Sequence, residues 1–395
     1  MKPIVLSPGA AFAIDRLESR GFDGYAVGGC VRDSLLGSAP HDWDLTTNAT
    51  PPEIVAAFSD CRVIETGIQH GTVTVLYEKE PLEITTFRKD GAYADNRHPT
   101  AVTFSKTVDE DLSRRDFTVN AMAYHPKRGL VDLFGGQADL QNGVIRCVGD
   151  AKTRFNEDGL RILRAVRFAS ALGFALEEET ARAVTECTHL LDGIAKERIR
   201  EEWSKLLLGK TPATILQDYP EVFARVLPEI CPVNRQPLGF LAAAPLDLPV
   251  RLSLLFDSPE NAKKALLRLR YDNETQEKVI ALVKLQRGKL DFSEVGLRRL
   301  LRNYPAQTVG SLLCVLECKG QDVCAAKSTL QTILARGDCT SLQALAITGN
   351  DLIALGIPAG KQIGALLEAL LDRVIDGSLP NEKAALLEAA KTLKK

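Results

Sequence analysis

The chain has 395 residues, of which 45% are hydrophobic and 25% are charged. This length is too great for one ordinary hydrophobic core, and it predicts two to four domains. The composition is that of a soluble globular protein. No run of about 18 uncharged apolar residues indicates a membrane span. The N-terminal apolar stretch is too short for a signal peptide, so a cytoplasmic location is the expected default.

Charge and cysteine content restrict the partners and ligands. The formal net charge of −2 gives no global positive field for nucleic acid, so RNA binding must depend on local basic patches. The nine cysteines are scattered and odd in number, which indicates reduced thiols rather than a disulfide framework. Cys314, Cys318 and Cys324 lack the paired spacing of zinc sites and are interpreted as small core residues.

The hydrophobic patterns of the first 150 residues predict mixed helices and strands. The predicted elements are a helix over 8–20, strands over 25–27, 42–45, 72–77 and 82–88, and helices that follow Gly29 and Thr50. Thr50 is the expected cap of its helix, with proline in the first turn and Glu53 three residues later.

The turn after the first predicted strand contains Gly28 and Gly29, followed by Arg32. Two adjacent glycines let the backbone approach a bulky charged ligand, because no Cβ stands in the way. An arginine can donate forked hydrogen bonds to phosphate oxygens. The stretch favours a phosphate-binding turn, although a plain Gly-Gly turn uses the same residues.

Asp42 and Asp44 follow on the next predicted strand. Their side chains point to the same face of an extended segment, because side chains alternate along a strand. A carboxylate pair beside a phosphate cradle suits Mg²⁺, which prefers oxygen ligands and bridges protein to substrate phosphates. Glu83 either brings a third carboxylate to this pair or faces solvent, and its spacing leaves both interpretations open.

The predicted strands 72–77 and 82–88 are expected to pair as a hairpin, and two polar segments follow them. The stretch from Asp90 to Pro99 has no periodicity and predicts a loop of the length often found at functional sites. Further on, Arg114, Arg115 and Asp116 open a predicted helix-like segment. Beside a triphosphate site, Arg115 is better explained as an anion ligand than as a solvated charge.

From about residue 155 the chain is helical in period almost throughout. One helix is predicted over Phe155–Phe168. Its charged residues Asp158, Arg161, Arg164 and Arg167 are three positions apart, so their side chains shift gradually around one side of the helix. A solvated face with an Asp–Arg pair is the ordinary interpretation. Three arginines beside a single Asp–Glu pair leave excess positive charge, which fits a face that meets anions.

The remaining chain continues with helices predicted over 177–192 and 196–208, a proline-rich stretch, and a final helical hundred residues. In the last part, residues 348–361 predict a helix–turn–helix capped by Asn350 or Asp351. Backbone amides and Lys361 at this turn can hold phosphate. An ordinary interhelical turn is the stronger interpretation.

Taken in order, five motifs resemble those of the class II tRNA nucleotidyltransferases, the CCA-adding enzymes of the polymerase β nucleotidyltransferase superfamily. They are Gly28-Gly-Cys-Val-Arg-Asp33, Asp42-Trp-Asp44, Gly67-Ile-Gln-His-Gly-Thr72, Arg114-Arg-Asp-Phe-Thr118 and Glu157-Asp-Gly-Leu-Arg161. The resemblance implies an α+β head with a mixed or antiparallel sheet, followed by an all-α neck, body and tail in an elongated seahorse-like architecture. The implied ranges are 1–142 for the head, 143–209 for the neck, 210–290 for the body and 291–395 for a tRNA-binding tail.

The resemblance also implies a reaction. The 3′-hydroxyl of tRNA attacks the α-phosphate of CTP or ATP in line, and two Mg²⁺ ions on Asp42 and Asp44 activate that oxygen and stabilise the leaving pyrophosphate. Glu83 matches the position of a third active-site carboxylate. The residues that match the triphosphate and ribose contacts are Gly28, Gly29, Arg32, Arg115 and Asp116.

In this family, the residues that match Asp158 and Arg161 select CTP or ATP without a nucleic-acid template. A carboxylate offers only acceptors and an arginine only donors, so the pair complements the Watson–Crick edge of cytosine or adenine. Guanine and uracil leave groups unpaired, at a cost of about 1–3 kcal/mol per group. Arg164 and Arg167 match positions that complete the nucleotide site.

The loop with Asp90, Gly91 and Arg97 resembles the flexible element that helps to switch from C to A addition. It departs from the pattern at His98, where a second arginine is common. The implied partner is tRNA, bound by its acceptor stem and, at the tail, by its elbow, with Lys361 as a candidate contact. No membrane partner is implied, and the chain is expected to be a monomer or a homodimer.

Several related activities compete with complete CCA addition. A bacterial poly(A) polymerase shares the head motifs, but residues 65–71 read Glu-Thr-Gly-Ile-Gln-His-Gly rather than the Gly-Arg-Arg-Phe element of those enzymes. The retained loop argues against an enzyme that adds only CC, whereas an enzyme that adds only the final A stays open. Intact Asp42 and Asp44 argue against an inactive RNA-binding relative.

Overall fold

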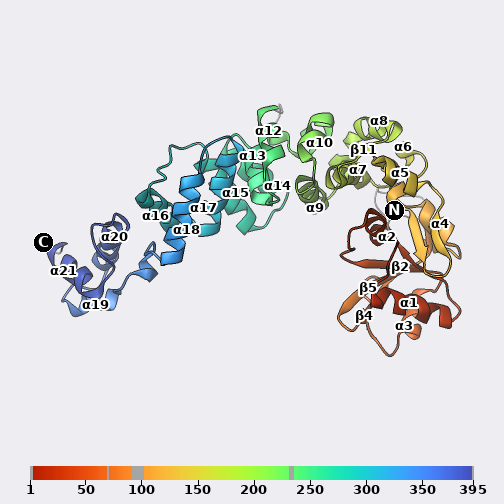
Figure 1. The fold of residues 1–395 in the computed structure, drawn as a ribbon, viewed down its shortest axis with the longest axis horizontal. Helices are drawn as coiled ribbons and strands as arrows, with labels where there is room; N and C mark the ends of the chain where they lie inside the picture. The colour runs from red at the N-terminus through yellow and green to blue at the C-terminus, as the bar shows by residue number, and fades with distance from the viewer. Residues whose placement is uncertain (1–2, 69–70, 91–101, 231–234, 394–395) are drawn as a thin grey trace. The chain divides into compact units, whose positions relative to one another are not determined.

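The computed structural model describes residues 3–68, 71–90, 102–230 and 235–393. The chain forms two compact units, Met1–Val233 (unit 1) and Asn234–Lys395 (unit 2), and Figure 1 shows the strands gathered in unit 1. Within the described ranges, no helix is long and apolar enough to cross a membrane. The division into head, neck, body and tail at the predicted borders stays a prediction.

Unit 1 begins with a seven-stranded sheet in the order β3-β4-β5-β2-β1-β8-β9. β2 and β5 run parallel, and the other neighbouring pairs run antiparallel. The strands are β1 (Gly24–Val27), β2 (Trp43–Thr47), β3 (Arg62–Ile64), β4 (Thr72–Tyr77), β5 (Glu80–Thr86), β8 (Met122–His125) and β9 (Gly129–Asp132). Two smaller sheets pair β6 (Arg88–Asp90) with β7 (Val102–Phe104) and β10 (Val144–Ile145) with β11 (Ala175–Leu176).

The helices of unit 1 surround the sheet and then continue without it. They are α1 (Pro8–Ser19), α2 (Gly29–Leu36), α3 (Pro51–Ala57), α4 (Val108–Ser113), α5 (Gly136–Asn142), α6 (Ala151–Glu157), α7 (Leu160–Leu172), α8 (Glu178–Glu186), α9 (Lys196–Leu207), α10 (Pro212–Asp218) and α11 (Pro220–Val226). Short 3-10 helices cover Thr118–Asn120, Thr188–Gly193 and Pro228–Ile230. The predicted cap of α3 is confirmed, because Thr50 and Glu53 form a capping box.

The two faces of the main sheet differ in polarity. One face carries Leu45, Leu82 and Ile84, which are fully buried, and α1 and α3 contact the strands that carry them. The opposite face carries Asp44 and its register partner Glu83, both exposed. Alternation along paired strands therefore puts the hydrophobic side chains under helices and leaves two carboxylates together on the other side.

The single helix predicted over 155–168 is wrong, because the chain breaks at Asp158. α6 ends at Glu157, and Asp158 has an extended backbone with φ −142° and ψ 105°. The Asp158 carboxylate accepts the N–H of Leu160 at 3.0 Å, at the start of α7. A short carboxylate that bonds a nearby backbone N–H favours a cap over a continuing helix. The pattern of apolar residues alone did not reveal this competition.

Unit 2 is all-α in the part of it that is described. Its helices are α12 (Arg235–Ala243), α13 (Leu248–Leu255), α14 (Pro259–Arg268), α15 (Asn273–Leu285), α16 (Glu294–Asn303), α17 (Ala306–Cys318), α18 (Cys324–Arg336), α19 (Gly349–Ala354), α20 (Lys361–Ile375) and α21 (Lys383–Leu393). Separate hydrophobic clusters centre on Leu312 and on Leu370. The cap of α19 is Thr348 rather than Asn350 or Asp351, and Asp351 closes its capping box.

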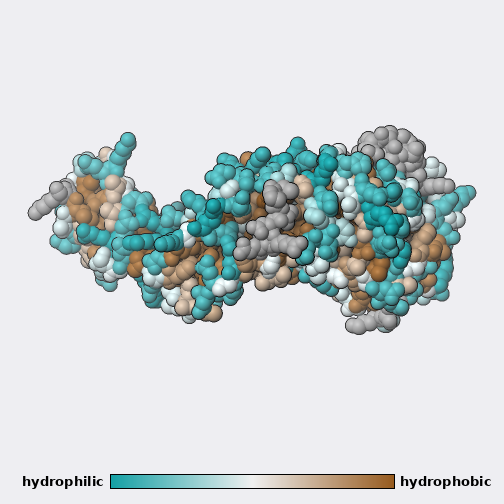
Figure 2. All heavy atoms as spheres, turned by 90° about the horizontal axis from the view of Figure 1, so that it is seen from above, coloured by the Kyte–Doolittle hydropathy of each residue, from teal (hydrophilic) through white to brown (hydrophobic). Residues whose placement is uncertain are grey.

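The polarity of the surface and the state of the cysteines match what the composition predicted. Figure 2 shows that hydrophilic side chains cover much of the visible face, with smaller hydrophobic patches between them. The cysteines in the described ranges are free thiols. Cys314 and Cys318 pack against the cluster around Leu312, as expected, whereas Cys324 is exposed at the start of α18.

Candidate active site

The glycine turn joins β1 to α2 with a backbone that only glycine adopts readily. Gly28 has a φ of +80° and caps α2, whose first turn receives no hydrogen bond from a capping side chain. A Cβ on Gly28 would lie 3.0 Å from Nη1 of Arg115, and one on Gly29 would lie 3.8 Å from Nη2 of Arg32. Two guanidinium groups and the N–H groups of a helix start therefore gather at one turn, which is the donor set for an anion.

Arg32 is held in place by three contacts from different elements. Its Nε donates to Asp33 at 2.8 Å, and its Nη1 donates to Oδ1 of Asn120 at 2.7 Å. Its guanidinium carbon lies 5.2 Å from the centroid of the Phe168 ring on α7. These contacts leave Nη2 as the group nearest Gly29, so the arginine is oriented toward the turn before any ligand arrives.

Arg115 comes directly after α4 rather than at the start of a helix. α4 ends at Ser113 with Arg114 as its C-cap, so the expected helix opening at these arginines is wrong. Asp111 is fully buried and accepts from Arg114 at 2.6 Å and from Arg115 at 3.1 Å. Burial opposes the effect, but the charges of Arg115 and Arg114 hold the pKa of Asp111 below its usual value. Asp111 thereby fixes Arg115 beside Gly28.

The carboxylates lie on the sheet face that is not covered by α1 and α3. Asp44 on β2 and Glu83 on β5 are register partners, and Asp42 precedes β2. Part of Asp44 is open to solvent, yet the surrounding protein atoms and the charges of Asp42 and Glu83 raise its pKa to about 6. The positive charge of Arg115 acts in the opposite direction. The charges of Asp42 and Glu83 therefore both act on the carboxylate of Asp44.

This arrangement fits a divalent cation by its charge and donor chemistry. Carboxylate oxygens are the ligands that Mg²⁺ prefers, and the ion usually keeps waters or substrate phosphates as further ligands. Across the part of the chain that the structure describes, no group of three or more His, Cys, Asp or Glu side chains converges into a complete metal site. Asp42 and Asp44 can accordingly provide some of the ligands of a divalent cation, and a phosphate-bearing substrate would provide others.

A pocket of about 270 Å³ opens between the end of α4 and the helices α7 and α9. Arginine and aspartate side chains dominate its lining, which consists of Arg114, Arg115, Asp116, Asp158, Leu160, Arg161, Arg164 and Arg198. Arg161 pairs with Glu157 and also donates to the carbonyl oxygens of Arg154 and Arg114, both at 3.1 Å. Its guanidinium group is therefore fixed at the wall of the pocket.

Arg164 and Arg167 have buried acidic partners that the spacing did not indicate. Arg164 donates to Oδ2 of Asp116 from Nε at 2.8 Å and from Nη2 at 2.7 Å. Glu202 on α9 accepts from Nη1 of Arg164 at 3.4 Å and from Nε of Arg167 at 2.8 Å. Burial opposes the shift, but the Arg164 charge and hydrogen bond lower the pKa of Asp116 to about 2. The excess positive charge expected on this face is thus largely neutralised.

The structure brings most of the predicted site residues into unit 1 at two adjoining places. Gly28, Gly29 and Arg32 form the turn with Arg115, which also lines the pocket of Asp116, Asp158, Arg161 and Arg164. Arg167 lies behind that pocket against Glu202 and the ring of Phe168. Gly91 and Arg97 lie outside the described residues, as does the side chain of Asp90. Lys361 is exposed at the start of α20 in unit 2.

Sequence reasoning missed the residues that hold the site residues in place. They are Asp111, Asn120, Glu157, Arg198 and Glu202. Arg198 and Glu202 are four residues apart on α9 and share a helix face, which is the only sequence signal they carry. Their spacing does not predict their partners, which are Asp158 for Arg198 and two arginines of α7 for Glu202.

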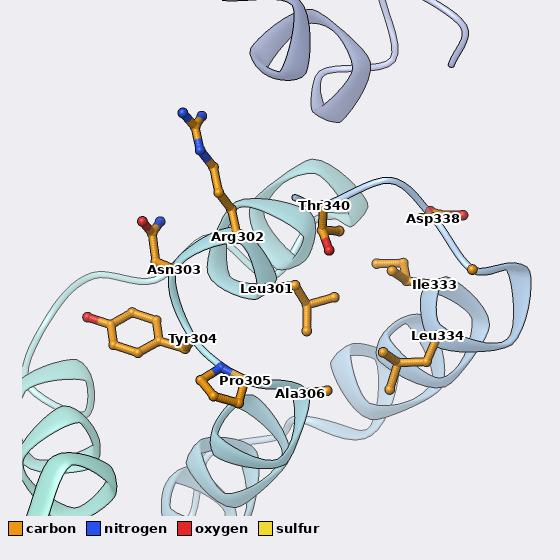
Figure 3. A pocket seen from close by; sticks show the side chains of 11 residues that line it. Leu301, Arg302, Asn303, Tyr304, Pro305, Ala306, Ile333, Leu334, Asp338 and Thr340 are labelled. Carbon is orange, nitrogen blue, oxygen red and sulfur yellow. The ribbon is translucent and has the colours of Figure 1, made fainter. Parts of the chain in front are cut away.

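Unit 2 contains a pocket of its own, of about 330 Å³. Figure 3 shows Leu301 and Ile333 facing each other across it and Arg302 pointing away from it. Arg302 instead pairs with Glu368 and Asp372 of α20. None of the predicted nucleotide-site residues lines this pocket.

Three segments of the chain match known protein families. Residues 24–146 match the poly(A) polymerase head domain, residues 173–232 match the probable RNA- and SrmB-binding site of polymerase A, and residues 250–390 match a putative tRNA nucleotidyltransferase domain 2. The head match spans the main sheet, the glycine turn and the ion pairs of Asp111 with Arg114 and Arg115, whereas Asp158, Arg161 and Arg164 come after it.

Similar proteins cover nearly the whole chain. A CCA-adding enzyme of Lactobacillus delbrueckii subsp. bulgaricus is 40% identical over 395 residues, covering 95% of each chain. One of Pediococcus pentosaceus is 37% identical and covers 98% of each. The crystal structure of Bacillus stearothermophilus CCA-adding enzyme in complex with CTP has a TM-score of 0.84 and 31% identity, covering 98% of this chain and 99% of that one.

The sheet, the glycine turn and the head match together define a nucleotidyltransferase with a polymerase-type head. The similarity continues through the helical unit with the same class of relatives. The chain belongs to the class II CCA-adding enzymes, which are tRNA nucleotidyltransferases. This membership confirms the resemblance seen in the motifs and the α+β head followed by helices.

Proposed function

We propose that this enzyme builds or repairs the complete 3′-terminal CCA of tRNA from CTP and ATP without a template. The observation that carries the proposal is the pocket in which Arg115 of the head meets Asp158 and Arg161 of the following helices. One wall carries Arg115, which also lies beside the glycine turn, and the other carries donors and acceptors for a base. Support comes from the relatives named above, one of which was solved with CTP.

The proposed chemistry is an in-line displacement at the α-phosphate. The tRNA 3′-oxygen forms a bond to that phosphorus while the bond to pyrophosphate breaks, and the hydroxyl proton is lost. The turn at Gly28 and Gly29, with Arg32 and Arg115, holds the triphosphate and neutralises its charge. Asp116 is proposed to lie near the ribose of the bound nucleotide.

The carboxylates complete this proposal. Two Mg²⁺ ions held by Asp42 and Asp44 would supply Lewis-acid stabilisation of the attacking and leaving oxygens. Glu83 is the register partner of Asp44 and adds negative charge at the same place. Burial, together with the negative charges of Asp42 and Glu83, raises the pKa of Asp44, and this cost of an ionised carboxylate favours a cation there.

Asp158 and Arg161 are proposed to read the base. The exocyclic amino group of cytosine or adenine donates to the carboxylate, and the ring nitrogen beside it accepts from the guanidinium group. Uracil and guanine present a carbonyl oxygen to the carboxylate, which repels it. Arg164 and Arg167 lie next to this pair and hold its surroundings through Asp116 and Glu202.

The proposal places the tRNA acceptor end at the head and neck and its elbow at the tail, residues 291–395. The descriptions of the families matched by residues 173–232 and 250–390 support RNA contact beyond the head. Lys361, exposed at the start of α20, remains the candidate contact.

The decisive experiment supplies three tRNAs, ending before CCA, after C and after CC, with each nucleotide and with CTP and ATP together. Sequencing the products should show C, C and A added in order and then termination. Addition of A only to the tRNA ending in CC would reveal an A-adding enzyme, and long A tracts would reveal a poly(A) polymerase. An Asp42→Asn variant is the matched inactive control.

A further inference from the structure

Arg198 on α9 lies outside the five motifs on which the family resemblance rests, yet it contacts a residue at the centre of one of them. Its Nη2 donates to Oδ2 of Asp158 at 2.8 Å, and its Nη1 lies 3.4 Å from Oδ1. The two side chains are 26% and 18% exposed, and both line the 270 Å³ pocket. The forked geometry uses both ends of the guanidinium group against both carboxylate oxygens.

Asp158 has few other supports. Its backbone is extended between α6 and α7, so no helix fixes the direction of its side chain. Apart from Arg198, the hydrogen bond found for the carboxylate among the described residues is the 3.0 Å contact from the Leu160 N–H to Oδ1. That single contact leaves the carboxylate free to rotate about it. Arg198 removes this freedom.

The lone pairs of the carboxylate show what remains for a ligand. Each oxygen accepts about two hydrogen bonds. Oδ1 accepts from Leu160 and faces Nη1 of Arg198, whereas Oδ2 accepts from Nη2 of Arg198 alone. Among the contacts of the described residues, one acceptor position on Oδ2 is therefore left for a ligand in the pocket that Asp158 lines, and it suits the one N–H that an exocyclic amino group turns to the Watson–Crick edge.

We propose that Arg198 is a positioning residue for nucleotide selection: it holds the Asp158 carboxylate so that Oδ2 accepts from the amino group of cytosine or adenine. This inference rests on the proposed base-reading role of Asp158. Arginine suits the task because its planar fork fixes both oxygens, whereas lysine presents a single ammonium point charge. The substrate class it serves is a nucleoside triphosphate with an amino group on its Watson–Crick edge.

A purely structural role for Arg198 predicts a different outcome. α9 is already anchored by the buried side chains of Ile199, Trp203 and Leu206, and a partly exposed ion pair adds little to folding stability. Loss of folded enzyme would lower the rate with every nucleotide by the same factor. Loss of carboxylate orientation would lower the rate with CTP and ATP more than with UTP.

The test compares Arg198→Gln and Arg198→Lys with wild type, using a tRNA that lacks CCA. The measured quantity is the ratio of kcat/KM for CTP to that for UTP. We expect the ratio to fall about 10- to 100-fold in Arg198→Gln, since small misplacements of a reacting or recognising group have effects of this size. Arg198→Lys should recover part of the ratio, because it keeps the charge and loses the fork.

The matched control is Arg225→Gln, which removes an exposed ion pair to Asp192 in the same unit and away from the pocket. Its CTP:UTP ratio should equal that of wild type. A wild-type ratio in both Arg198 variants would overturn the inference, even if their overall rates fell. If Arg198→Gln does not fold, the ratio in Arg198→Lys decides the question.

An Asp158→Ala variant separates this inference from the proposed function. If Asp158→Ala loses discrimination while both Arg198 variants keep it, Asp158 reads the base without help from Arg198. If Asp158→Ala keeps full discrimination, the base-reading proposal fails, and the positioning role fails with it. Loss of discrimination in Asp158→Ala and Arg198→Gln together supports both.

Discussion

Arg164 of α7, whose side chain is 32% exposed, and the buried Asp116 of the head form a two-bonded ion pair, with Nε and Nη2 lying 2.8 and 2.7 Å from the same carboxylate oxygen. The other oxygen of Asp116 accepts from its neighbour Phe117 and from Asn120. The pair links two segments that are 48 positions apart in the sequence. Both residues line the nucleotide pocket, so loss of the pair should affect the pocket wall and the stability of the head together.

Asp116→Asn is expected to destabilise the protein by about 1–3 kcal/mol, because the buried carboxylate accepts from Arg164, Phe117 and Asn120, and an amide leaves part of these donors without an acceptor. Equilibrium unfolding in urea measures this change. Asp60→Asn is a matched control, since Asp60 pairs with Arg16 on an exposed surface and should change stability little. Equal changes in the free energy of unfolding would show that the Asp116–Arg164 pair stabilises the fold no more than an exposed ion pair does.

The same carboxyl group gives a prediction for acid stability. Its folded-state pKa of about 2 is below the ordinary value of 3.8, so the unfolded chain binds the proton more readily. The stabilisation is fully present above about pH 4 and is lost as the pH falls through about 2. The difference in unfolding free energy between wild type and Asp116→Asn should therefore shrink over that range. A difference that stays constant down to about pH 2 would contradict the low pKa.

Asp44→Asn is expected to lower incorporation of labelled CTP and ATP by about 10³-fold or more, since the proposed cation loses a ligand. Binding of tRNA, followed by gel shift, should persist because the helical regions are unchanged. Without divalent cations the variant should be at least as stable as wild type, because burial and the charges of Asp42 and Glu83 oppose the ionised form of Asp44 at neutral pH. Normal incorporation by the variant would refute the metal assignment.

Gly28→Ala is expected to cost about 1–3 kcal/mol of stability, because an L side chain is strained at a φ of +80°. Its Cβ would also press on Nη1 of Arg115, so the KM for nucleotide should rise. Gly129→Ala is the control: its φ is +81°, but a Cβ there meets no atom within 4 Å. The control should lose stability and keep its KM. A rise in KM of the same size in both variants would exclude a specific contact with Arg115.

Arg161→Ala should reduce discrimination against UTP and GTP by about 10²-fold, since the donors that match cytosine and adenine are removed. Single-nucleotide incorporation on a tRNA lacking CCA provides the measurement. Arg182→Ala, which removes exposed ion pairs on α8 outside the pocket lining, serves as the control. Unchanged selectivity in Arg161→Ala would show that another group reads the base.

Features that depend on neighbouring residues were predictable from the sequence. The glycine turn, the capping box of Thr50 and Glu53, the hairpin of β4 and β5 and the all-helical second half follow from local sterics, caps and hydrophobic period. Alternation on one strand predicted a common face for Asp42 and Asp44, whereas β2 begins at Trp43 and includes only Asp44. The order of the motifs then pointed to the family.

Features that depend on distant residues came from tertiary packing. The parallel pairing of β2 with β5 is what puts Glu83 beside Asp44, and the sequence left that side chain with two interpretations. The contact of Arg198 with Asp158 arises because α9 packs against α7. Spacing along a chain records which residues share a strand or helix face. Which faces then meet is set by burial of hydrophobic surface and pairing of buried charges over the whole unit.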